Sequence, residues 1–324
     1  MSPPDYLKSS NVSTNTAVNT ALYPYGLSPL NDVVPATALC VVSIISSLVA
    51  VTANGLVLWA IKKTPSLHTP SSALIFVLAA SDFAVGAFVQ PLVVIKLIAL
   101  LTNNFPVFFI SGTMFYPLAV AFSFVSFVTI TAISVERYLA LALHLRYAEI
   151  VTVSRVITCI VPVCALPLTL TILSFWLWAK KWFEITTMGI CLFLGAACTF
   201  AIPFSYYKIF AILRRHKKRI HDQTSVATGV HGLSQINVSK YRKSVLTILY
   251  VVGSSILTYL PCGISAVIVW RLNTEFSRVM FQIFGPIILL NSSINPLVYC
   301  WRVKEIRRFV ASKLRCLYLM EVIT

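Results

Sequence analysis

The chain has 324 residues, of which 58% are hydrophobic and only 11% are charged, and its formal net charge is +16. Soluble domains carry about a quarter charged residues, so this composition excludes an ordinary soluble protein. A positive excess can indicate nucleic-acid binding, but membrane topology already explains it, and we expect no nucleic-acid partner.

The first 34 residues are polar, rich in Ser, Thr and Asn, and lack the apolar core of a signal peptide. We therefore expect residues 1–34 to form an extracellular segment, with the first span acting as an uncleaved insertion signal. Asn11 begins the sequon Asn11-Val12-Ser13. A glycan at Asn11 is thus predicted, which would make the protein a glycoprotein.

Seven apolar segments long enough to cross a bilayer, which takes roughly 20 residues each, follow within residues 35–301. The predicted spans are Pro35–Ile61, Ser71–Leu100, Phe105–Leu139, Val156–Trp178, Thr187–Leu213, Lys243–Trp270 and Arg278–Trp301. The expected fold is an all-α membrane protein, a seven-transmembrane helix bundle.

The distribution of Lys and Arg sets the orientation, because basic residues are retained on the cytoplasmic side. Six of the 26 fall on the side of the N-terminus, and the other 20 fall in the alternate loops and the tail, including the cluster 214–219. We expect a multi-pass plasma-membrane protein with an extracellular N-terminus. Its basic inner surface would face anionic membrane lipid.

Residues 302–324 are predicted to form a short amphipathic eighth helix, at Arg302–Leu314, followed by a cytoplasmic tail. Cys316 lies just beyond that helix, where a juxtamembrane Cys is a candidate for palmitoylation; a free thiol is an equal alternative. The other seven cysteines fall in or at the edge of spans, so no extracellular disulfide is expected.

Asp82 is the only acid in the middle of a predicted span, where an ionisable side chain is costly unless it has partners. Ser126, Asn291, Ser292 and Asn295 lie at compatible depths on other spans. Their oxygens could surround a sodium ion or a water cluster; the alternative is a hydrogen-bonded polar cluster without an ion. We favour the ion, because an unpaired carboxylate at that depth would otherwise have to be protonated.

Pro296 interrupts the last span within the run Asn295-Pro296-Leu297-Val298-Tyr299. A proline inside a spanning helix leaves one backbone carbonyl without its helical donor, and hydrocarbon offers no replacement. We therefore expect a neighbouring group to donate to that carbonyl. Such a weak point suits a helix that rearranges.

Several spans carry short motifs in a fixed order. The motifs are Asn54, Leu78-Ala79-Ala80-Ser81-Asp82, Glu136-Arg137-Tyr138, Pro261 and Asn295-Pro296-Leu297-Val298-Tyr299. Over about residues 35–316 the chain resembles the rhodopsin-like (class A) G-protein-coupled receptors. The second outer loop, about Ala179–Ile185, is short. This short loop and the missing extracellular disulfide look like the melanocortin, adenosine and cannabinoid branch.

The resemblance implies a heterotrimeric G protein as partner and an activation switch at the inner end. In the family the Arg, here Arg137, is held at rest by its neighbouring acid, here Glu136, and turns inward on activation to meet Tyr207 and Tyr299. The sixth span then swings out and opens a pocket for the G-protein tail. Tyr138, Tyr259, Pro261, Asn295 and Pro296 belong to the same switch, and sodium at the Asp82 set is implied to stabilise the inactive state.

Departures from the family pattern fall in five places. Gly112 stands where most members have a Cys, Pro162 where a Trp is usual, and Tyr259 where Cys-Trp-x-Pro has its Trp. In the fifth span Thr199 takes the usual Pro position, with Pro203 one turn later. At the inner end of the sixth span, Tyr241 replaces the acid with which many members restrain the Arg.

Ligand class is approached by elimination. Ala119 replaces the Asp of amine receptors, and Leu289 replaces the Schiff-base Lys of opsins. The predicted pocket is small and mostly apolar, with lining residues Ala119, Val120, Ser123, Cys262 and Ala266. An extracellular ligand that is small and neutral, or lipid-like, fits best.

A transporter or channel using Asp82 as its ion site is the alternative, but no internal repeat or further midplane charge supports it. An enzyme is not expected, because every His falls on the cytoplasmic side and no nucleophile or metal constellation occurs in the sequence. No cofactor is expected beyond a possible Na⁺ ion.

Overall fold

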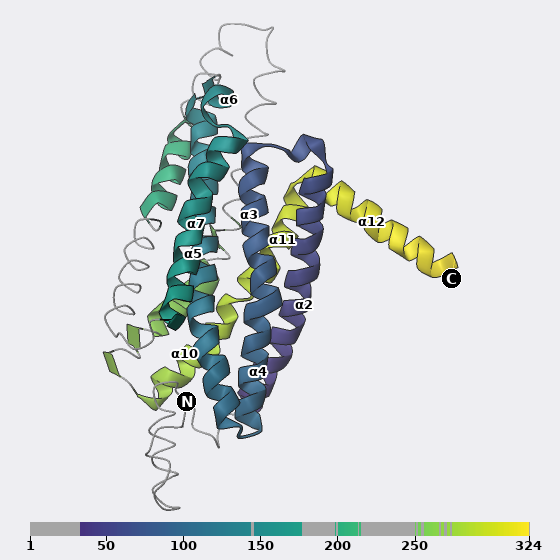
Figure 1. Cartoon of the computed structure of the whole chain (residues 1–324). Helices are drawn as coiled ribbons and strands as arrows, with labels where there is room; N and C mark the ends of the chain where they lie inside the picture. Colours follow the sequence, from purple (N-terminus) through teal and green to yellow (C-terminus); the bar gives the residue numbers. More distant parts are fainter. Residues whose placement is uncertain are drawn as a thin grey trace, which may run out of the picture.

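The structure is a computed structural model of the chain, and it is helical throughout its described regular elements (Figure 1). It describes residues 33–143, 146–176, 198, 200–212, 214, 250, 252–253, 256–265, 267–268, 271–272 and 274–323. Predictions for Asn11, Thr199, Tyr241 and Ala266 lie outside these residues, as does the side chain of Cys316.

The long helices run side by side as an elongated bundle, from which the last helix projects (Figure 1). They are α2 (Val33–Lys63), α3 (Pro70–Ala84), α4 (Gln90–Leu101), α5 (Phe105–Leu143), α7 (Val153–Trp176), α10 (Glu275–Ile288), α11 (Asn291–Arg302) and α12 (Lys304–Ile323). Short elements are η3 (Pro65–Leu67), η4 (Val85–Val89) and α6 (Tyr147–Ile150). Helix α12 is longer than the predicted eighth helix, Arg302–Leu314.

Five described helices are long and apolar enough to cross a membrane: Ala36–Lys63, Pro70–Leu101, Phe105–Leu143, Val153–Leu170 and Ile283–Trp301. Two shorter apolar helices, Phe200–Ile212 and Ile256–Ser265, lie within the predicted fifth and sixth spans. Each of the seven predicted spans therefore contains an apolar helix.

The second span is continuous from α3 through η4 to α4, and its irregular turn follows from Pro91. That proline has no N–H, so in the π-helical turn Val85–Val89 the carbonyl of Gly86 lacks its helical donor. The Ser47 hydroxyl of α2 donates to this carbonyl at 2.7 Å. Gly86 is needed here, because a Cβ at this position would lie 2.8 Å from the Cβ of Ala50.

The seventh span contains the second irregular point. Helix α10 ends at Ile288 and α11 begins at Asn291. Within α11, Pro296 leaves the carbonyl of Ser292 without its helical donor, and the Asn54 side-chain amide donates to that carbonyl at 2.9 Å. The predicted rescue of the freed carbonyl is thus confirmed, with the first span as the donor.

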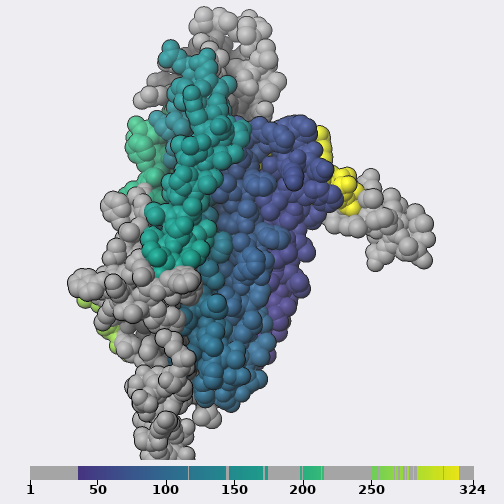
Figure 2. Space-filling view, in the orientation of Figure 1, coloured from purple at the N-terminus to yellow at the C-terminus, as the bar shows by residue number. Residues whose placement is uncertain are grey.

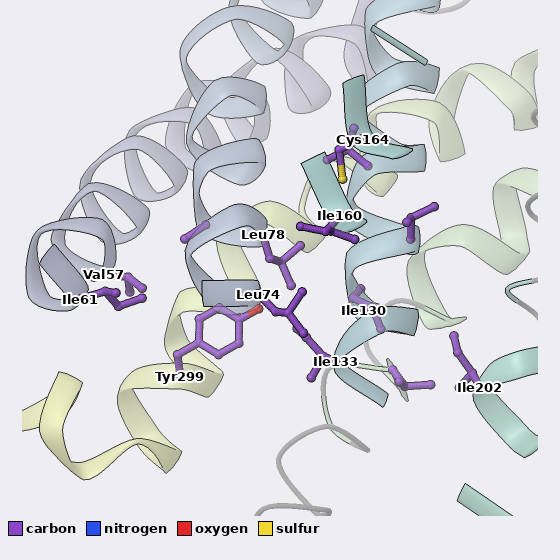
Figure 3. Close-up of a cluster of buried hydrophobic side chains, with 14 of the residues drawn as sticks. Val57, Ile61, Leu74, Leu78, Ile130, Ile133, Ile160, Cys164, Ile202 and Tyr299 are labelled. Atoms are coloured by element: carbon purple, nitrogen blue, oxygen red, sulfur yellow. The ribbon is translucent and has the colours of Figure 1, made fainter. Parts of the chain in front are cut away.

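Apolar side chains between the helices form two main clusters. The larger lies in the half of the bundle nearer Arg137 and includes Leu74, Leu78, Ile130, Ile133, Ile160 and Tyr299 (Figure 3). Ile306 of α12 is fully buried in it, which anchors the start of that helix. The smaller cluster, nearer Lys96, joins α2, α4, Phe115 and Leu289.

Helices α2, α3 and α4 cover one face of the bundle without a break (Figure 2). On α2, Val41, Ile45 and Leu48 project outward and are about half exposed or more. Their spacing places them on one side of the helix, opposite the polar side chains that bond to other spans. An apolar outside and a polar inside are what a helix in lipid requires.

Candidate functional site

Asp82 of α3 is fully buried near the middle of the bundle. The Asn295 side-chain amide donates to Asp82 Oδ2 at 2.8 Å. Ser126 and Ser292 lie near the same carboxylate, but Asp82 Oδ1 accepts no well-formed hydrogen bond from the described residues. We call Asp82, Ser126, Asn291, Ser292 and Asn295 the Asp82 cluster; all five side chains are buried.

The Asp82 cluster therefore offers carboxylate, hydroxyl and amide oxygens from three spans as possible ligands. Hard cations prefer such oxygen ligands. The side-chain oxygen of Asn295, like Asp82 Oδ1, forms no hydrogen bond with the described residues. Two oxygens in one buried cluster are thus available to a small cation or to water.

Tyr259, at the position of the family's Trp, connects the sixth span to the Asp82 cluster. Its hydroxyl lies near Ser123 of α5 and Asn291 of α11, and its ring centroid is 6.2 Å from that of Phe127. Ser123 was predicted as a pocket residue, and the structure places it against Tyr259. The Tyr at this position thus touches the third and seventh spans together.

Glu136 of α5 is buried, and three side chains contact its carboxylate. Arg137 Nε lies 3.2 Å from Glu136 Oε2, the Ser71 hydroxyl donates to Oε1 at 2.9 Å, and the Tyr147 hydroxyl donates to the same oxygen. We call these four residues the Glu136 cluster. Burial, and then the hydrogen bond to Glu136, raise the pKa of Tyr147 well above its usual range, so its hydroxyl keeps its proton.

The fifth span requires a correction. Tyr207, predicted to meet Arg137, is 71% exposed and faces away from the bundle. Its neighbour Tyr206 is 7% exposed, and its hydroxyl lies near Ser134 and Arg137. Tyr206, and not Tyr207, therefore faces the interior of the bundle, and we propose it as the partner of Arg137. The exposed stripe Phe200, Phe204 and Tyr207 has helical spacing, and that apolar stripe is the sequence signal that could have separated the two tyrosines.

The remaining switch residues lie close to this end. Tyr299 is buried, its ring directed toward Leu74 (Figure 3), and its hydroxyl forms no hydrogen bond with the described residues. Tyr138 packs against the larger apolar cluster. Arg137 is thus paired with Glu136 in this structure, in the arrangement that the resemblance implies for the resting state.

The predicted ligand-pocket residues are less unified. Ala119 packs against the smaller apolar cluster, Cys262 is half-buried, and Val120 is 47% exposed. Val120 therefore lies on a different face of α5 from Ala119, as its position one residue later in a helix requires.

Gly112, where the disulfide tether is absent, lies under the side chain of Lys96. A Cβ at Gly112 would meet Lys96 Cε at 3.9 Å. The Lys96 ammonium lies 5.4 Å from the ring centroid of Phe108 and 5.7 Å from that of Phe115. A cation–π contact thus joins α4 to α5 where most family members have a disulfide.

Comparison with known proteins follows the same lines. The family model described as "7 transmembrane receptor (rhodopsin family)" matches residues 53–299. Adenosine receptor A3 of Bos taurus is 24% identical over 285 residues, covering 82% of this chain and 86% of the relative. Trace amine-associated receptor 9 of Homo sapiens is 28% identical, covering 80% of each chain.

Melanocortin receptor 4 of Danio rerio is 28% identical over 282 residues, covering 84% of this chain and 82% of the relative. The crystal structure of squid rhodopsin superposes with a TM-score of 0.73 at 16% identity, covering 91% of this chain and 89% of that one, which confirms the predicted seven-transmembrane fold. The transporter alternative receives no support from these matches. The chain belongs to the rhodopsin family of seven-transmembrane receptors, and its function is G-protein-coupled signalling.

Proposed function

We propose that this receptor passes the binding of an extracellular small or lipid-like ligand to a heterotrimeric G protein at the plasma membrane. The observation that carries the proposal is the Glu136 cluster, in which Arg137 is held by a buried acid at the end of the bundle. An Arg held by a breakable ion pair can exchange partners when the sixth span moves, and the buried Tyr206 and Tyr299 are its proposed new partners.

The proposed topology places residues 1–34 outside, residues 35–301 in the membrane and residues 302–324 inside. In support, most Lys and Arg residues belong to the side of Arg137 and α12. A glycan at Asn11 tests this topology: Asn11→Gln should remove a glycosidase-sensitive mass shift. Acylation of Cys316 remains a separate prediction.

The ligand class rests on the side chains near the Lys96 half of the bundle. Ala119 leaves no carboxylate for an ammonium group at the amine-receptor position, and the surrounding cluster is apolar. The names of the relatives refer to adenosine, trace amines and melanocortin, which are chemically unlike one another. The apolar lining therefore carries the assignment to a neutral or lipid-like molecule.

We further infer that the Asp82 cluster binds Na⁺ when Arg137 is paired with Glu136. The two oxygens without partners among the described residues, Asp82 Oδ1 and Asn295 Oδ1, support this assignment. A cation there would hold α3 to α11 across a low-dielectric interior, where an ion pair is stronger than in water.

The experiment reconstitutes the purified chain in lipid nanodiscs with heterotrimeric G proteins and measures GTP-for-GDP exchange without added ligand. We expect exchange above that of the G protein alone, and at least a tenfold loss of this increment in Arg137→Ala at equal receptor density. Arg155→Ala is the matched control, because the Arg155 guanidinium donates to the backbone carbonyls of Glu149 and Ile150 and does not pair with Glu136. Equal exchange in parent and Arg137→Ala would overturn the proposal.

A further inference from the structure

The first span supplies hydrogen-bonding groups to two other spans. On α2, Ser47 bonds to the carbonyl of Gly86 and Asn54 to the carbonyl of Ser292. Each contact supplies a donor to a carbonyl that a proline leaves without its helical donor, Pro91 in the second span and Pro296 in the seventh. A third contact from α2 involves no carbonyl freed by a proline. It joins Ser46 to Gln90 and Ser293, and nothing described above requires it.

Gln90, the first residue of α4, is 1% exposed. Its side-chain amide donates to the Ser46 hydroxyl at 2.8 Å and to the carbonyl of Leu289 at 3.1 Å. The Ser46 and Ser293 hydroxyl oxygens are 2.7 Å apart, and the Ser293 hydroxyl donates to the Ser46 carbonyl at 2.8 Å.

These contacts fix the direction of every proton. Since Ser293 donates to the carbonyl of Ser46, the Ser46 hydroxyl must donate to Ser293 Oγ, and the Ser46 oxygen then accepts from Gln90. Gln90, Ser46, Ser293 and the Leu289 carbonyl therefore form one directed chain, which we call the Gln90 chain. It links α4 and α2 to the seventh span.

The Gln90 chain meets the seventh span at its break. Around residues 289–290 the backbone hydrogen bonds join residues three positions apart instead of the four of an α-helix. Ser292 N–H donates to the Leu289 carbonyl at 3.2 Å, and Ser293 N–H donates to the Leu290 carbonyl at 3.0 Å. The regular donor to Leu289, Ser293 N–H, is thus engaged elsewhere. Gln90 is a second donor to the Leu289 carbonyl, beside Ser292 N–H, and it stabilises the tightened backbone at the break.

The chain is distinct from the Asp82 cluster and lies beside it. Ser292 and Ser293 are neighbours at the start of α11: Ser292 lies near Asp82, whereas Ser293 bonds to Ser46. The Gln90 Oε1 atom forms no hydrogen bond with the described residues. A buried amide in lipid that uses only its donors is expensive, and an intramembrane polar residue of this kind is a functional candidate.

We propose that Gln90 is a positioning residue for signalling, which holds the break in the seventh span in the form that accompanies Arg137 paired with Glu136. This inference rests on the proposed function, because Tyr299 of the seventh span is one of the residues that Arg137 is proposed to meet on activation. A contact made in one state and lost in the other biases the equilibrium toward the first. Removing the Gln90 chain should therefore raise ligand-independent signalling.

The test uses the nanodisc exchange assay at matched receptor density. Gln90→Met keeps the length of the side chain but removes its donors, and Ser293→Ala removes the next hydroxyl of the chain. We expect each variant to raise basal exchange about two- to fivefold, and the double variant to exceed the larger single effect only slightly, since both break the same chain. Ser47→Ala, which removes a neighbouring α2 hydroxyl bonded only to the second span, should leave basal exchange within about 1.5-fold of the parent.

Backbone deuterium exchange of the peptide covering residues 289–294 gives a second readout that needs no G protein. Gln90→Met should accelerate exchange in this peptide, and Ser47→Ala should not. The proposal is overturned if Gln90→Met leaves both readouts at parent values, or if Ser47→Ala raises both equally. A parent that gives no more G-protein exchange than Arg137→Ala contradicts the proposed function instead, and the deuterium result then decides whether Gln90 holds the break.

Discussion

Asp82 and Glu136 are both buried acids in spanning helices, yet their surroundings differ. Glu136 has an ion pair and two hydroxyl donors. Asp82 has one well-formed hydrogen bond, from Asn295, and its Oδ1 atom has none from the described residues. A buried charge is stable only when paired and hydrogen-bonded. Glu136 has a cationic partner, although its Oε2 atom forms no well-formed hydrogen bond with the described residues, whereas Asp82 has no cationic partner among them.

This difference assigns different roles to the two acids. The partners of Glu136 come from Ser71 at the start of α3, from Arg137 and from Tyr147 of α6, so movement of these elements breaks the cluster from within. Asp82 has no cationic partner among the described residues, so an ion, a proton or water from outside the protein could take that place. In the proposed mechanism, Glu136 stabilises the resting arrangement, and Asp82 makes that arrangement sensitive to sodium.

The largest expected effect comes from removing the charge of Asp82. Asp82→Asn should abolish any sodium dependence of basal signalling or of agonist binding, because the carboxylate is the cation's main partner. The measurement is a sodium titration of nucleotide exchange at constant ionic strength, with choline replacing sodium. Superimposable titrations in Asp82→Asn and the parent would contradict the sodium site.

The next largest effect is expected from removing one hydrogen bond to Glu136. Tyr147→Phe removes a hydroxyl that donates to a buried carboxylate, and a hydrogen bond to a charged group contributes about 1.5–3 kcal/mol. Because Tyr147 is only half-buried, we expect the low end of that range, and thus about a tenfold rise in ligand-independent exchange.

Ile150→Ala is the control for Tyr147→Phe, since it alters an exposed side chain of the same short helix. A sodium titration separates the two acids further. Tyr147→Phe should keep the sodium response that Asp82→Asn loses. If Tyr147→Phe also lost it, the two acids would not be independent.

How much of this could be read from the sequence depends on what each residue needs. Asp82 and Asn295 were predictable together, because a midspan acid must find a polar partner at its own depth. The donor to the carbonyl freed by Pro296 was predictable as a need, and the packing of α2 then identified it as Asn54. The Gln90 chain gave no such signal, since the hydrogen-bond acceptor of Gln90 is a backbone carbonyl at a helix break.

The tyrosines of the fifth span show a different reason for error. Tyr206 and Tyr207 are about 100° apart around a helix, so counting along a motif displaced by one residue selects the wrong face. The position of Pro203, one turn from the family's usual proline, removed the reference for that count. Tyr147 was missed because it lies in a loop helix of four residues, outside every apolar segment.

The smallest expected effect concerns the restraint that the Glu136 cluster does not receive from the sixth span. Many family members place an acid at the position of Tyr241, which here lies outside the described residues and is flanked by Lys240, Arg242 and Lys243. No Asp or Glu occurs from Gln223 to Thr274, and like charges repel. Among the described residues Glu136 is the one acid that pairs with Arg137, so the resting state lacks a restraint, whereas the open state lacks none.

We therefore expect measurable ligand-independent signalling in the parent, and a decrease in Tyr241→Glu, which supplies an acid on the Arg137 side. Partly exposed ion pairs contribute about 0–1 kcal/mol, so the decrease should not exceed about fivefold. Tyr241→Gln is the matched control, because it has the size of Glu without its charge. The charge argument requires Tyr241→Glu to signal less than Tyr241→Gln at equal surface density, and the gap between them to shrink as salt is raised; equal output from the two variants, or parent output equal to that of mock-transfected cells, would refute it.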